Sequence, residues 1–259
     1  YKTSYHISKK SKHATKIANK AIENGCDVIV AIGGDGTVNE IATVAIKNNI
    51  PLGIIPIGSG NGLGNYLKIP QDIAESINII NKYKVKFIDV GYINDYLFVN
   101  VAGVGFDAEV AKAYSKLSIR GFAGYFHSTV LNYIPYKSKK YKIRFNNQVI
   151  ARKALLISFA NSGQYGYNTS IAPEAEIDDG LIDMCIMDKV PPFLVPFVVS
   201  QFFTKTIDHT PYHESYKISE AFVYLNSEPV IHVDGEPIKL PDKILHVRAV
   251  PQALQVICP

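Results

Sequence analysis

The sequence predicts a two-part α/β plus β protein, in which an amino-terminal parallel α/β domain precedes a mostly antiparallel β domain. Two observations support this fold class. Up to about residue 84, short β-branched runs alternate with segments of helical periodicity, the pattern of a parallel sheet with crossover helices. From residue 85 onward, strand-like segments follow one another between polar turns. A length of 259 residues leaves room for two modest cores.

In the first part, helices and strands alternate in order. Apolar residues at helical spacing predict a helix over residues 10–24, and Gly25 is a natural C-terminal stop. The run VIVAI at 28–32 predicts a strand buried on both faces. Helical periodicity resumes at 38–47, and PLGII at 51–55 predicts a second buried strand. This order favours a parallel sheet.

The second part carries the β-rich pattern. Two helical interruptions are predicted, near residues 106–136 and 191–204. The strand-like segments between polar turns are KVKFIDVGYI, YLFVNVAG, KKYKIRFN, ALLISFAN, LIDMCIMD, AFVYLN and ILHVRAV. No repeat or low-complexity tract interrupts them.

Composition narrows the class of protein. With 47% hydrophobic and 19% charged residues, the chain is typical of a folded globular protein. A net charge of +4 suits a phosphate-bearing ligand or an anionic membrane surface and disfavours nucleic acid as a partner. Three distant cysteines predict neither disulfides nor a zinc site, so a cytoplasmic location is expected.

Neither a signal peptide nor a membrane span is predicted. The longest apolar stretch, residues 190–203, is too short to cross a bilayer and contains prolines. The chain also begins without Met in a polar segment, so we expect an amino-terminal piece of the natural protein to precede it.

The strongest local motif is AIGGDGTVNE at residues 31–40. It joins a buried strand to a helix through a glycine-rich turn, where close backbone approach and unpaired helix N–H groups favour binding of a phosphate. Thr37 could add a hydroxyl donor, and Asp35 could orient a metal or accept a proton. The alternative is a glycine-rich turn in which Asp35 only caps the helix.

A second glycine-rich loop follows the next buried strand. Residues 56–70 read PIGSGNGLGNYLKIP, with Ser59 and Asn61 as hydrogen-bonding candidates. Both loops follow the C-terminal ends of strands, which is the ligand-binding edge of an open parallel sheet. The alternative is a purely structural loop. Neither a Walker A nor a GxGxxG motif is present.

Near the end of the chain, VIHVDGEPI at 230–238 places Asp234 and Glu236 around a glycine. Taken alone, this segment is typical of an Asp-Gly hairpin turn. Taken with the two glycine-rich loops, the two carboxylates become candidates for chemistry.

These motifs together resemble those of diacylglycerol kinases, sphingosine kinases and their bacterial lipid kinase relatives. GGDGTVNE, then GSGN, then Ala172-Pro173 with DDGL at 178–181, and finally VDGE occur in order along the whole chain. The resemblance implies an NAD kinase/diacylglycerol kinase-like first domain and a carboxy-terminal β-sandwich, with the nucleotide between them. It divides the chain into residues 1–84 plus the tail 250–259, and residues 85–249. The family's first strand and phosphate loop have no counterpart here, which puts nucleotide binding in doubt if the natural protein also lacks them.

The resemblance also implies specific roles for residues. Asp234, Glu236 or Asp35 would accept the proton, and we expect Asp234→Asn to abolish turnover without unfolding the chain. A structural Mg²⁺ would be held by Asp179 and by the main-chain oxygens of Glu176 and Leu181. The residues implied to contact ATP are Ser8, Gly33, Gly34, Asp35, Gly36, Thr37, Val38, Asn39, Gly58, Ser59, Gly60 and Asn61.

The predicted function is therefore an ATP- and Mg²⁺-dependent lipid kinase, with diacylglycerol or a sphingoid base as the acceptor. GSGN is closer to the sphingosine kinase form of the loop than to the GTxND form. An NAD kinase-like enzyme and a non-catalytic nucleotide- or lipid-binding module are the alternatives, and a homodimer is left open. Membrane contact is predicted at residues 190–203, at Phe122, Tyr125 and Phe126, and at Lys137, Lys139, Lys140 and Lys142, with core packing as the alternative for the aromatics.

Overall fold

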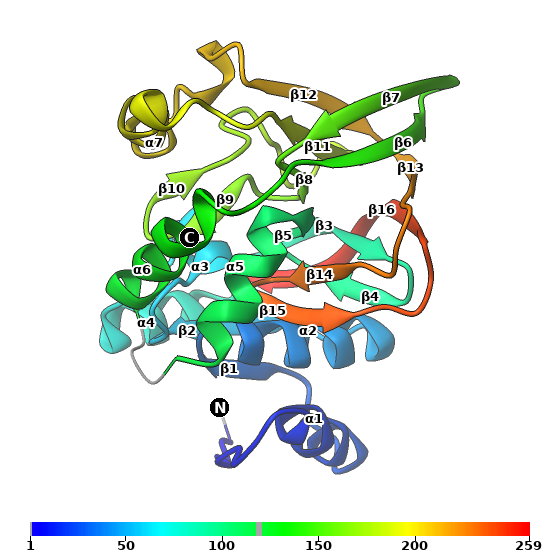
Figure 1. Cartoon of the computed structure of the whole chain (residues 1–259). Helices are drawn as coiled ribbons and strands as arrows, with labels where there is room; N and C mark the ends of the chain where they lie inside the picture. The colour runs from blue at the N-terminus through cyan, green and yellow to red at the C-terminus, as the bar shows by residue number, and fades with distance from the viewer. Residues whose placement is uncertain (1, 118–120) are drawn as a thin grey trace.

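The computed structural model describes residues 2–117 and 121–259. Its amino-terminal part alternates helices and strands as the periodicity predicts (Figure 1). Strands β1 and β2 are parallel, with Ala31 opposite Ile54. The elements of this part are α1 (His13–Glu23), β1 (Ile29–Gly33), α2 (Asp35–Asn48), β2 (Leu52–Pro56), α3 (Gly62–Tyr66) and α4 (Ile73–Lys82).

The remainder of the chain is β-rich with three α-helices in its described part. The helical segments are α5 (Phe106–Ser115), α6 (Phe122–Tyr133), η1 (Pro192–Leu194), α7 (Val195–Thr204) and η2 (Ile207–His209). Residues 118–120 of the predicted helical region lie outside the described residues. The strands are β3 (Val85–Ile93), β4 (Tyr96–Phe98), β5 (Val101–Gly105), β6 (Lys139–Phe145), β7 (Gln148–Ala154), β8 (Leu156–Ala160), β9 (Gln164–Gly166), β10 (Thr169–Ser170), β11 (Ile182–Met187), β12 (His213–Ile218), β13 (Glu220–Tyr224), β14 (Val230–Val233), β15 (Glu236–Lys239) and β16 (Ile244–Ile257).

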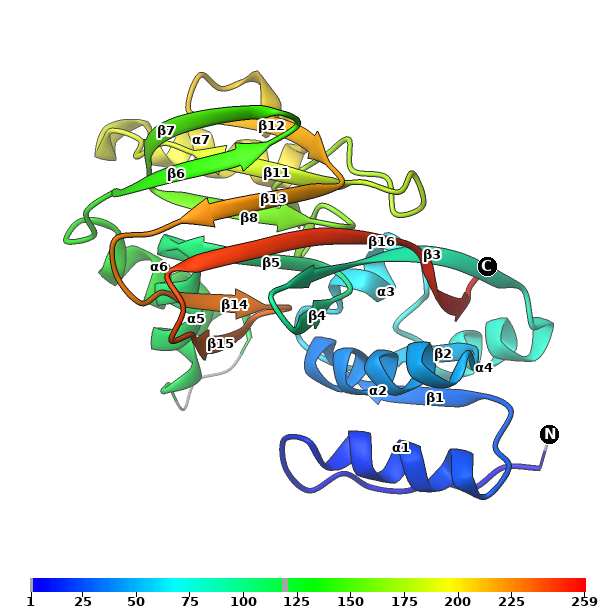
Figure 2. The same ribbon diagram turned by 90° about the vertical axis from the view of Figure 1, so that its right-hand side faces the viewer.

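Two large sheets organise these strands. One contains eight strands in the order β1-β2-β16-β13-β6-β7, with β3 attached to β16 and β4 to β3. The other contains six strands in the order β12-β11-β8-β5-β14-β15. Long β16 crosses the molecule (Figure 2) and pairs antiparallel with β13 and β3 and parallel with β2, where Val256 lies opposite Leu52. The carboxy-terminal strand thereby joins the first part of the chain to the second.

The β-rich core lies between the two sheets. Strand β6 shows why: Tyr141, Ile143 and Phe145 are buried, whereas the residues between them are exposed. This alternation is what a strand with one wet face requires. Buried residues from both sheets, such as Phe98 and Phe159, complete the same cluster.

The predicted fold class is confirmed, but helix α4 was missed. It begins at the N-cap Asp72, whose side chain accepts a 2.9 Å hydrogen bond from the Glu75 amide. The Asp72 to Glu75 spacing is a start signal that was present in the sequence. None of the described helices is long and apolar enough to cross a membrane.

Candidate functional site

The first glycine-rich turn connects β1 to α2. Helix α2 begins at Asp35, and its N-cap Gly34 offers no side-chain hydrogen bond to the first turn. The first N–H groups of a helix have no intrahelical partner, so they face outward with the positive end of the helix dipole. A Cβ at Gly33 would lie 2.7 Å from the hydroxyl oxygen of Thr37, so only glycine fits there. The turn is suited to bind an anion.

The second loop, after β2, is held by Asn61. This residue is buried and left-handed, with φ 52°. Its Oδ1 accepts a 2.9 Å hydrogen bond from the Gly58 amide, and its Nδ2 donates to the Gly58 carbonyl at 2.7 Å. Asn61 therefore shapes the loop, while Ser59 beside it is exposed and available to a ligand.

The two loops are in direct contact. A Cβ at Gly58 would lie 2.3 Å from the Gly34 Cα, so Gly58 must be glycine, and a Cβ at Gly34 would still lie only 3.1 Å from the Gly58 Cα. The Ile57 amide donates to the Gly33 carbonyl at 3.2 Å. The closest polar link is between Asp35 Oδ1 and the Gly62 amide, at 2.7 Å. The two cradles predicted from sequence thus form one continuous surface.

Asp234 comes to this surface from the far end of the chain and is buried. Asn39, in the first turns of α2, donates its Nδ2 to Asp234 Oδ2 at 2.7 Å. Val99 also donates its amide to Oδ2, at 3.0 Å. The amides of Asn100 and Val101 donate to Oδ1 at 2.9 and 3.0 Å. A carboxylate has about four acceptor positions, and these four donors fill them. Because the donors come from α2 and from the β4–β5 turn, Asp234 links these two elements.

Glu236 is exposed and lies over the start of α2. Its Oε1 would be 3.6 Å from a Cβ placed on Gly36. The hairpin turn Asp234-Gly235, in which both residues have positive φ, brings the glutamate back to this position. The structure therefore brings Glu236 together with the GGDGT turn.

Burial controls the protonation of the two aspartates. Burial raises the pKa of Asp35 above its ordinary value, while hydrogen bonds from the Gly62 and Asn61 amides oppose this shift. Burial likewise raises the pKa of Asp234 to about 6, against the hydrogen bonds from Val99, Asn39 and Asn100. A raised pKa is what a general base working near neutral pH needs.

The other residues predicted to contact ATP differ in how close they lie to the glycine-rich loops and in whether their amides are free. Val38 lies on the buried face of α2 and packs in the core, and its amide already donates to the Gly34 carbonyl at 3.1 Å. The Thr37 amide donates to the same carbonyl at 3.0 Å. Ser8 lies in the exposed segment before α1, and no contact in the described residues brings its side chain to the glycine-rich loops. The roles of these residues in binding ATP stay predictions.

The predicted structural metal site lies at residues 176–181. Asp179 Oδ2 accepts a 2.5 Å contact from the Lys217 ammonium, and its Oδ1 accepts a 3.0 Å hydrogen bond from the Leu181 amide. A cation bound through Asp179 would compete with the Lys217 ammonium for this carboxylate. The metal site at these residues stays a prediction.

The carboxylates of Asp35 and Glu236 lie at the GGDGT surface, where a magnesium ion would arrive with a nucleotide. Within the described residues, no group of three or more His, Cys, Asp or Glu side chains could hold a metal ion. Mg²⁺ commonly binds through one or two carboxylates plus substrate phosphates. Glu236, which is exposed beside Gly36, is the carboxylate that would supply this share.

Asn100 was not singled out from the sequence. A Cβ at Gly62 would lie 2.1 Å from Asn100 Nδ2, and that nitrogen donates to the Gln164 carbonyl at 2.5 Å. Asn100 therefore ties the second loop to the hairpin of β9 and β10. A lone Asn after a strand carries no local motif, so only the tertiary structure shows its role.

An exposed apolar face lies beside the site, on α6 and α7. On α6, Phe122, Phe126 and Val130 recur every fourth residue and are 45–52% exposed, and Ile134 at the helix end is 74% exposed. Its neighbour α7 contributes Phe203, whose ring is 6.2 Å from that of Phe122. The exposed large apolar residues on these segments, here called the aromatic face, are Phe122, Phe126, Val130, Leu131, Ile134, Phe193, Phe197 and Phe203.

Tyr125, which was also predicted to face lipid, lies elsewhere. It packs with Phe106 and Val110 in the cluster beneath α6, and its ring is 5.8 Å from that of Tyr114. The alternative of core packing therefore holds for Tyr125, because its side chain packs on the cluster beneath α6 while Phe122 and Phe126 are exposed.

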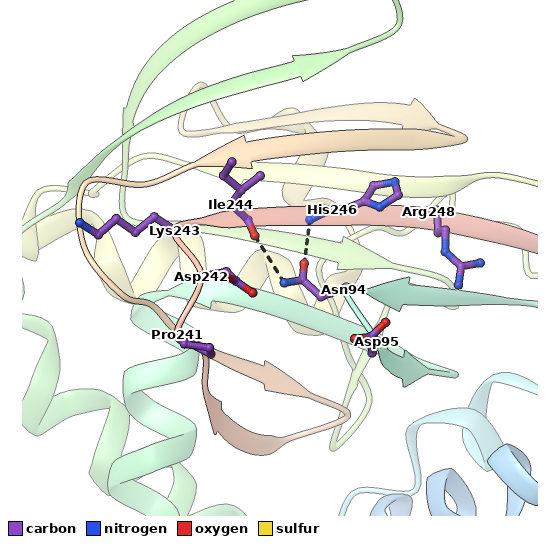
Figure 3. A pocket seen from close by; sticks show the side chains of 8 residues that line it. All are labelled: Asn94, Asp95, Pro241, Asp242, Lys243, Ile244, His246 and Arg248. Atoms are coloured by element: carbon purple, nitrogen blue, oxygen red, sulfur yellow. Dashed lines mark hydrogen bonds between the residues drawn. The ribbon is translucent and has the colours of Figure 1, made fainter.

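A hollow of about 680 Å³ lies away from these loops. None of its lining residues belongs to the glycine-rich turns, and Asn94 at its centre is held by the Ile244 carbonyl and the His246 amide (Figure 3). Its walls carry charges of both signs. The residues that line it are Asn94, Asp95, Pro241, Asp242, Lys243, Ile244, His246 and Arg248.

Comparison with known families accounts for both parts of the chain. Residues 1–93 match the diacylglycerol kinase catalytic domain, and residues 100–258 match the YegS C-terminal NAD kinase beta sandwich-like domain. The chain belongs to the diacylglycerol kinase family. The family and the prediction of a lipid kinase enzyme are thereby confirmed.

Individual relatives agree with this membership. A diacylglycerol kinase of Staphylococcus saprophyticus is 29% identical over 100% of this chain and 86% of its own length. Those of Staphylococcus haemolyticus and Staphylococcus aureus are 32% and 33% identical over 73% of the chain, which spans 58% and 61% of their lengths. A crystal structure from Bacillus anthracis that carries the name diacylglycerol kinase matches with a TM-score of 0.81 and 25% identity, over 97% of this chain and 84% of its own.

Proposed function

We propose that this chain transfers the γ-phosphoryl group of Mg·ATP to the hydroxyl of a membrane lipid, with diacylglycerol as the first candidate acceptor. The observation that carries the proposal is the 2.7 Å hydrogen bond from the Gly62 amide to Asp35 Oδ1, because it holds a half-buried carboxylate where the two glycine-rich loops meet. The names of the relatives support diacylglycerol.

Phosphoryl transfer needs positioning and charge neutralisation more than covalent chemistry. The N–H groups at the start of α2 and the second loop would hold the phosphates, and the hydroxyl of Ser59 would add a donor. Mg²⁺ would neutralise the phosphate charge, with Glu236 as its protein ligand, which leaves Asp35 free to accept a proton.

Asp35 is the proton acceptor that the geometry favours over Asp234. All four acceptor positions of Asp234 are filled by donors from Asn39 and from the β4–β5 turn. The acceptor oxygen would attack the γ-phosphorus and lose its proton to Asp35, while the bond from the γ-phosphorus to the β–γ bridging oxygen breaks and ADP leaves. Asp234 then acts as a positioning residue for α2.

The aromatic face supports docking on an anionic membrane surface, from which the acceptor would come. Phe193 and Phe197 are 81% and 64% exposed. Moving such apolar side chains from water into the membrane interface lowers the free energy. Lys137, Lys140 and Lys142 follow α6 in the chain and are exposed. Basic residues next to an apolar face favour anionic lipid.

The test is incubation with labelled ATP and a panel of acceptors. The panel contains diacylglycerol, sphingosine, ceramide, phosphatidylglycerol and NAD. Label in a lipid product is the expected result, and the product names the acceptor. Label in NADP alone would replace the proposal with an NAD kinase, and no labelled product from any acceptor would favour a binding module.

A further inference from the structure

The hairpin of β9 and β10 turns through two residues, Tyr167 and Asn168. Both have left-handed backbones, with φ 51° and 60°. A two-residue hairpin turn of this kind favours Asn and Gly, because a side chain crowds the backbone at positive φ. Asn168 is an ordinary occupant. Tyr167 is not, and a bulky residue in this conformation persists where the surroundings hold it.

Tyr167 lies at the meeting point of three features of the site. Burial raises the pKa of its phenol, the Ser59 hydroxyl lowers this pKa in part, and the Tyr114 side chain and the charge of Asp35 raise it. Its ring is 5.4 Å from that of Phe122, at an interplanar angle of 68°. Tyr167 therefore touches the second glycine-rich loop on one side and the aromatic face on the other.

The hairpin itself rests on that loop. A Cβ at Gly166 would lie 3.2 Å from the Gly60 Cα, so the two backbones pack with no side chain between them. Gln164, at the other end of β9, accepts the Asn100 hydrogen bond through its carbonyl. These contacts at both ends of β9 fix the position of the tyrosine.

A tyrosine has an apolar ring and a polar hydroxyl. A lipid alcohol is divided in the same way, into hydrocarbon chains and a short polar head. In the proposed reaction the head must reach Asp35, and the chains would leave toward the aromatic face. Tyr167 contacts the aromatic face through Phe122, and its hairpin packs on the loop that holds Asp35.

We propose that Tyr167 binds the acceptor and determines its specificity: the ring packs against the first carbons of the lipid chain, and the hydroxyl hydrogen-bonds an oxygen of the head. This role rests on the proposed lipid kinase function. It favours acceptors that join a long chain to a polar head over small water-soluble alcohols such as glycerol.

The experiment compares Tyr167→Gly and Tyr167→Phe with Asn168→Gly. Glycine suits both left-handed positions, so we expect all three proteins to fold with a Tm within about 3 °C of the original chain. For diacylglycerol in mixed micelles, we expect kcat/KM to fall about tenfold or more in Tyr167→Gly and about threefold or more in Tyr167→Phe. Asn168→Gly, the matched control in the same turn, should keep its activity.

Two further measurements separate the role of Tyr167 from others. The Kd for a non-hydrolysable ATP analogue should change less than about twofold in every variant, and discrimination between diacylglycerol and glycerol should fall in Tyr167→Gly. Unchanged kcat/KM for diacylglycerol in Tyr167→Gly would overturn the inference, as would a parallel loss of nucleotide affinity. If the original chain phosphorylates no lipid alcohol, the proposed function fails as well. If it does and Tyr167→Gly matches it, only the inference about Tyr167 fails.

Discussion

Asp35 and Gly62 join the two glycine-rich loops through one hydrogen bond, from the Gly62 amide to Asp35 Oδ1 at 2.7 Å. The bond fixes the carboxylate at the first residue of α2, where the helix dipole and the loop amides attract an anion. Asp35 therefore has both a fixed orientation and a raised pKa, the two properties of a general base.

Replacing Asp35 with Asn tests this role. Asn keeps an oxygen that can accept from Gly62, but it cannot take a proton. We expect kcat to fall by about 100- to 10,000-fold, with the midpoint of urea unfolding nearly unchanged. Asp95→Asn, on the exposed β3–β4 turn, is the matched control and should lose no activity. An Asp35→Asn variant that keeps a tenth or more of the activity of the original chain would show that another group accepts the proton.

Asp234→Asn should behave differently, because Asp234 is surrounded by donors. An Asn side chain has one acceptor oxygen, so its NH₂ group would face two of the four N–H donors. We expect the free energy of unfolding to fall by about 2–5 kcal/mol, measured by urea denaturation. This revises the sequence-based expectation that the variant would keep its fold intact. A variant as stable as the original chain with no activity would return Asp234 to the list of proton acceptors.

The sequence predicted the parts of the site better than their roles. GGDGT follows β1 and GSGN follows β2, and parallel strands that end at the same edge must bring their loops together. Strand β2 is buried as predicted, whereas β1 lies at the edge of its sheet and its Ile32 is 54% exposed. The approach of Glu236 to Gly36 depends on the last two strands, and it could be expected only from the family resemblance.

Roles set by tertiary hydrogen bonds were not predictable. Asp234 appears in the sequence as half of a catalytic pair, but its partners Val99, Asn100 and Val101 lie more than 130 residues away in the chain. Asn61 is predicted to contact ATP, and in the structure its side chain holds its own loop. In each case the side chain forms hydrogen bonds with backbone groups. Because every residue has the same backbone groups, a sequence motif does not show which of them a side chain will contact.

The ion pair between Lys217 and Asp179 lies at the predicted structural metal site, and it predicts how magnesium affects the Tm of the protein. The Lys217 ammonium already neutralises the carboxylate, and Asp179 raises the pKa of Lys217 in return. We expect millimolar Mg²⁺ to shift the Tm of the original chain by less than about 1 °C, and to stabilise Lys217→Met more than the original chain. Asp179→Asn in addition to Lys217→Met should remove the gain. A clear Mg²⁺-dependent rise in the original chain would support the metal site despite Lys217.

If the aromatic face enters the membrane surface, a single acidic substitution on this face should weaken membrane binding. Replacing Phe197 or Ile134 with Asp puts a carboxylate where an apolar side chain would enter the lipid surface. In vesicle flotation, we expect each variant to lower the bound fraction on phosphatidylglycerol-containing vesicles about fivefold or more. Val149→Asp, at a 56% exposed apolar position on β7, is the matched control and should bind normally. Equal flotation of all proteins would argue against this face.

Asp183 predicts how stability depends on pH. It is 5% exposed in β11, and burial raises its pKa to about 6, with Asp179 adding to the shift and Lys217 opposing it. The folded state therefore holds this proton more tightly than the unfolded chain, whose carboxyl has the ordinary value of 3.8. The contribution of this proton to stability is complete below the unfolded pKa and is lost as the pH rises through about 6.

Asp183→Asn removes that titration and keeps the shape of the side chain. The free energy of unfolding of the variant, relative to the original chain, should rise by about 1–3 kcal/mol between pH 4 and pH 7. Urea denaturation at a series of pH values measures this difference directly. Asp242→Asn, at an exposed position before β16, should give a difference that does not change with pH. If the relative stability of Asp183→Asn instead fell with rising pH, ionised Asp183 would be stabilising, and the Lys217 charge would outweigh burial.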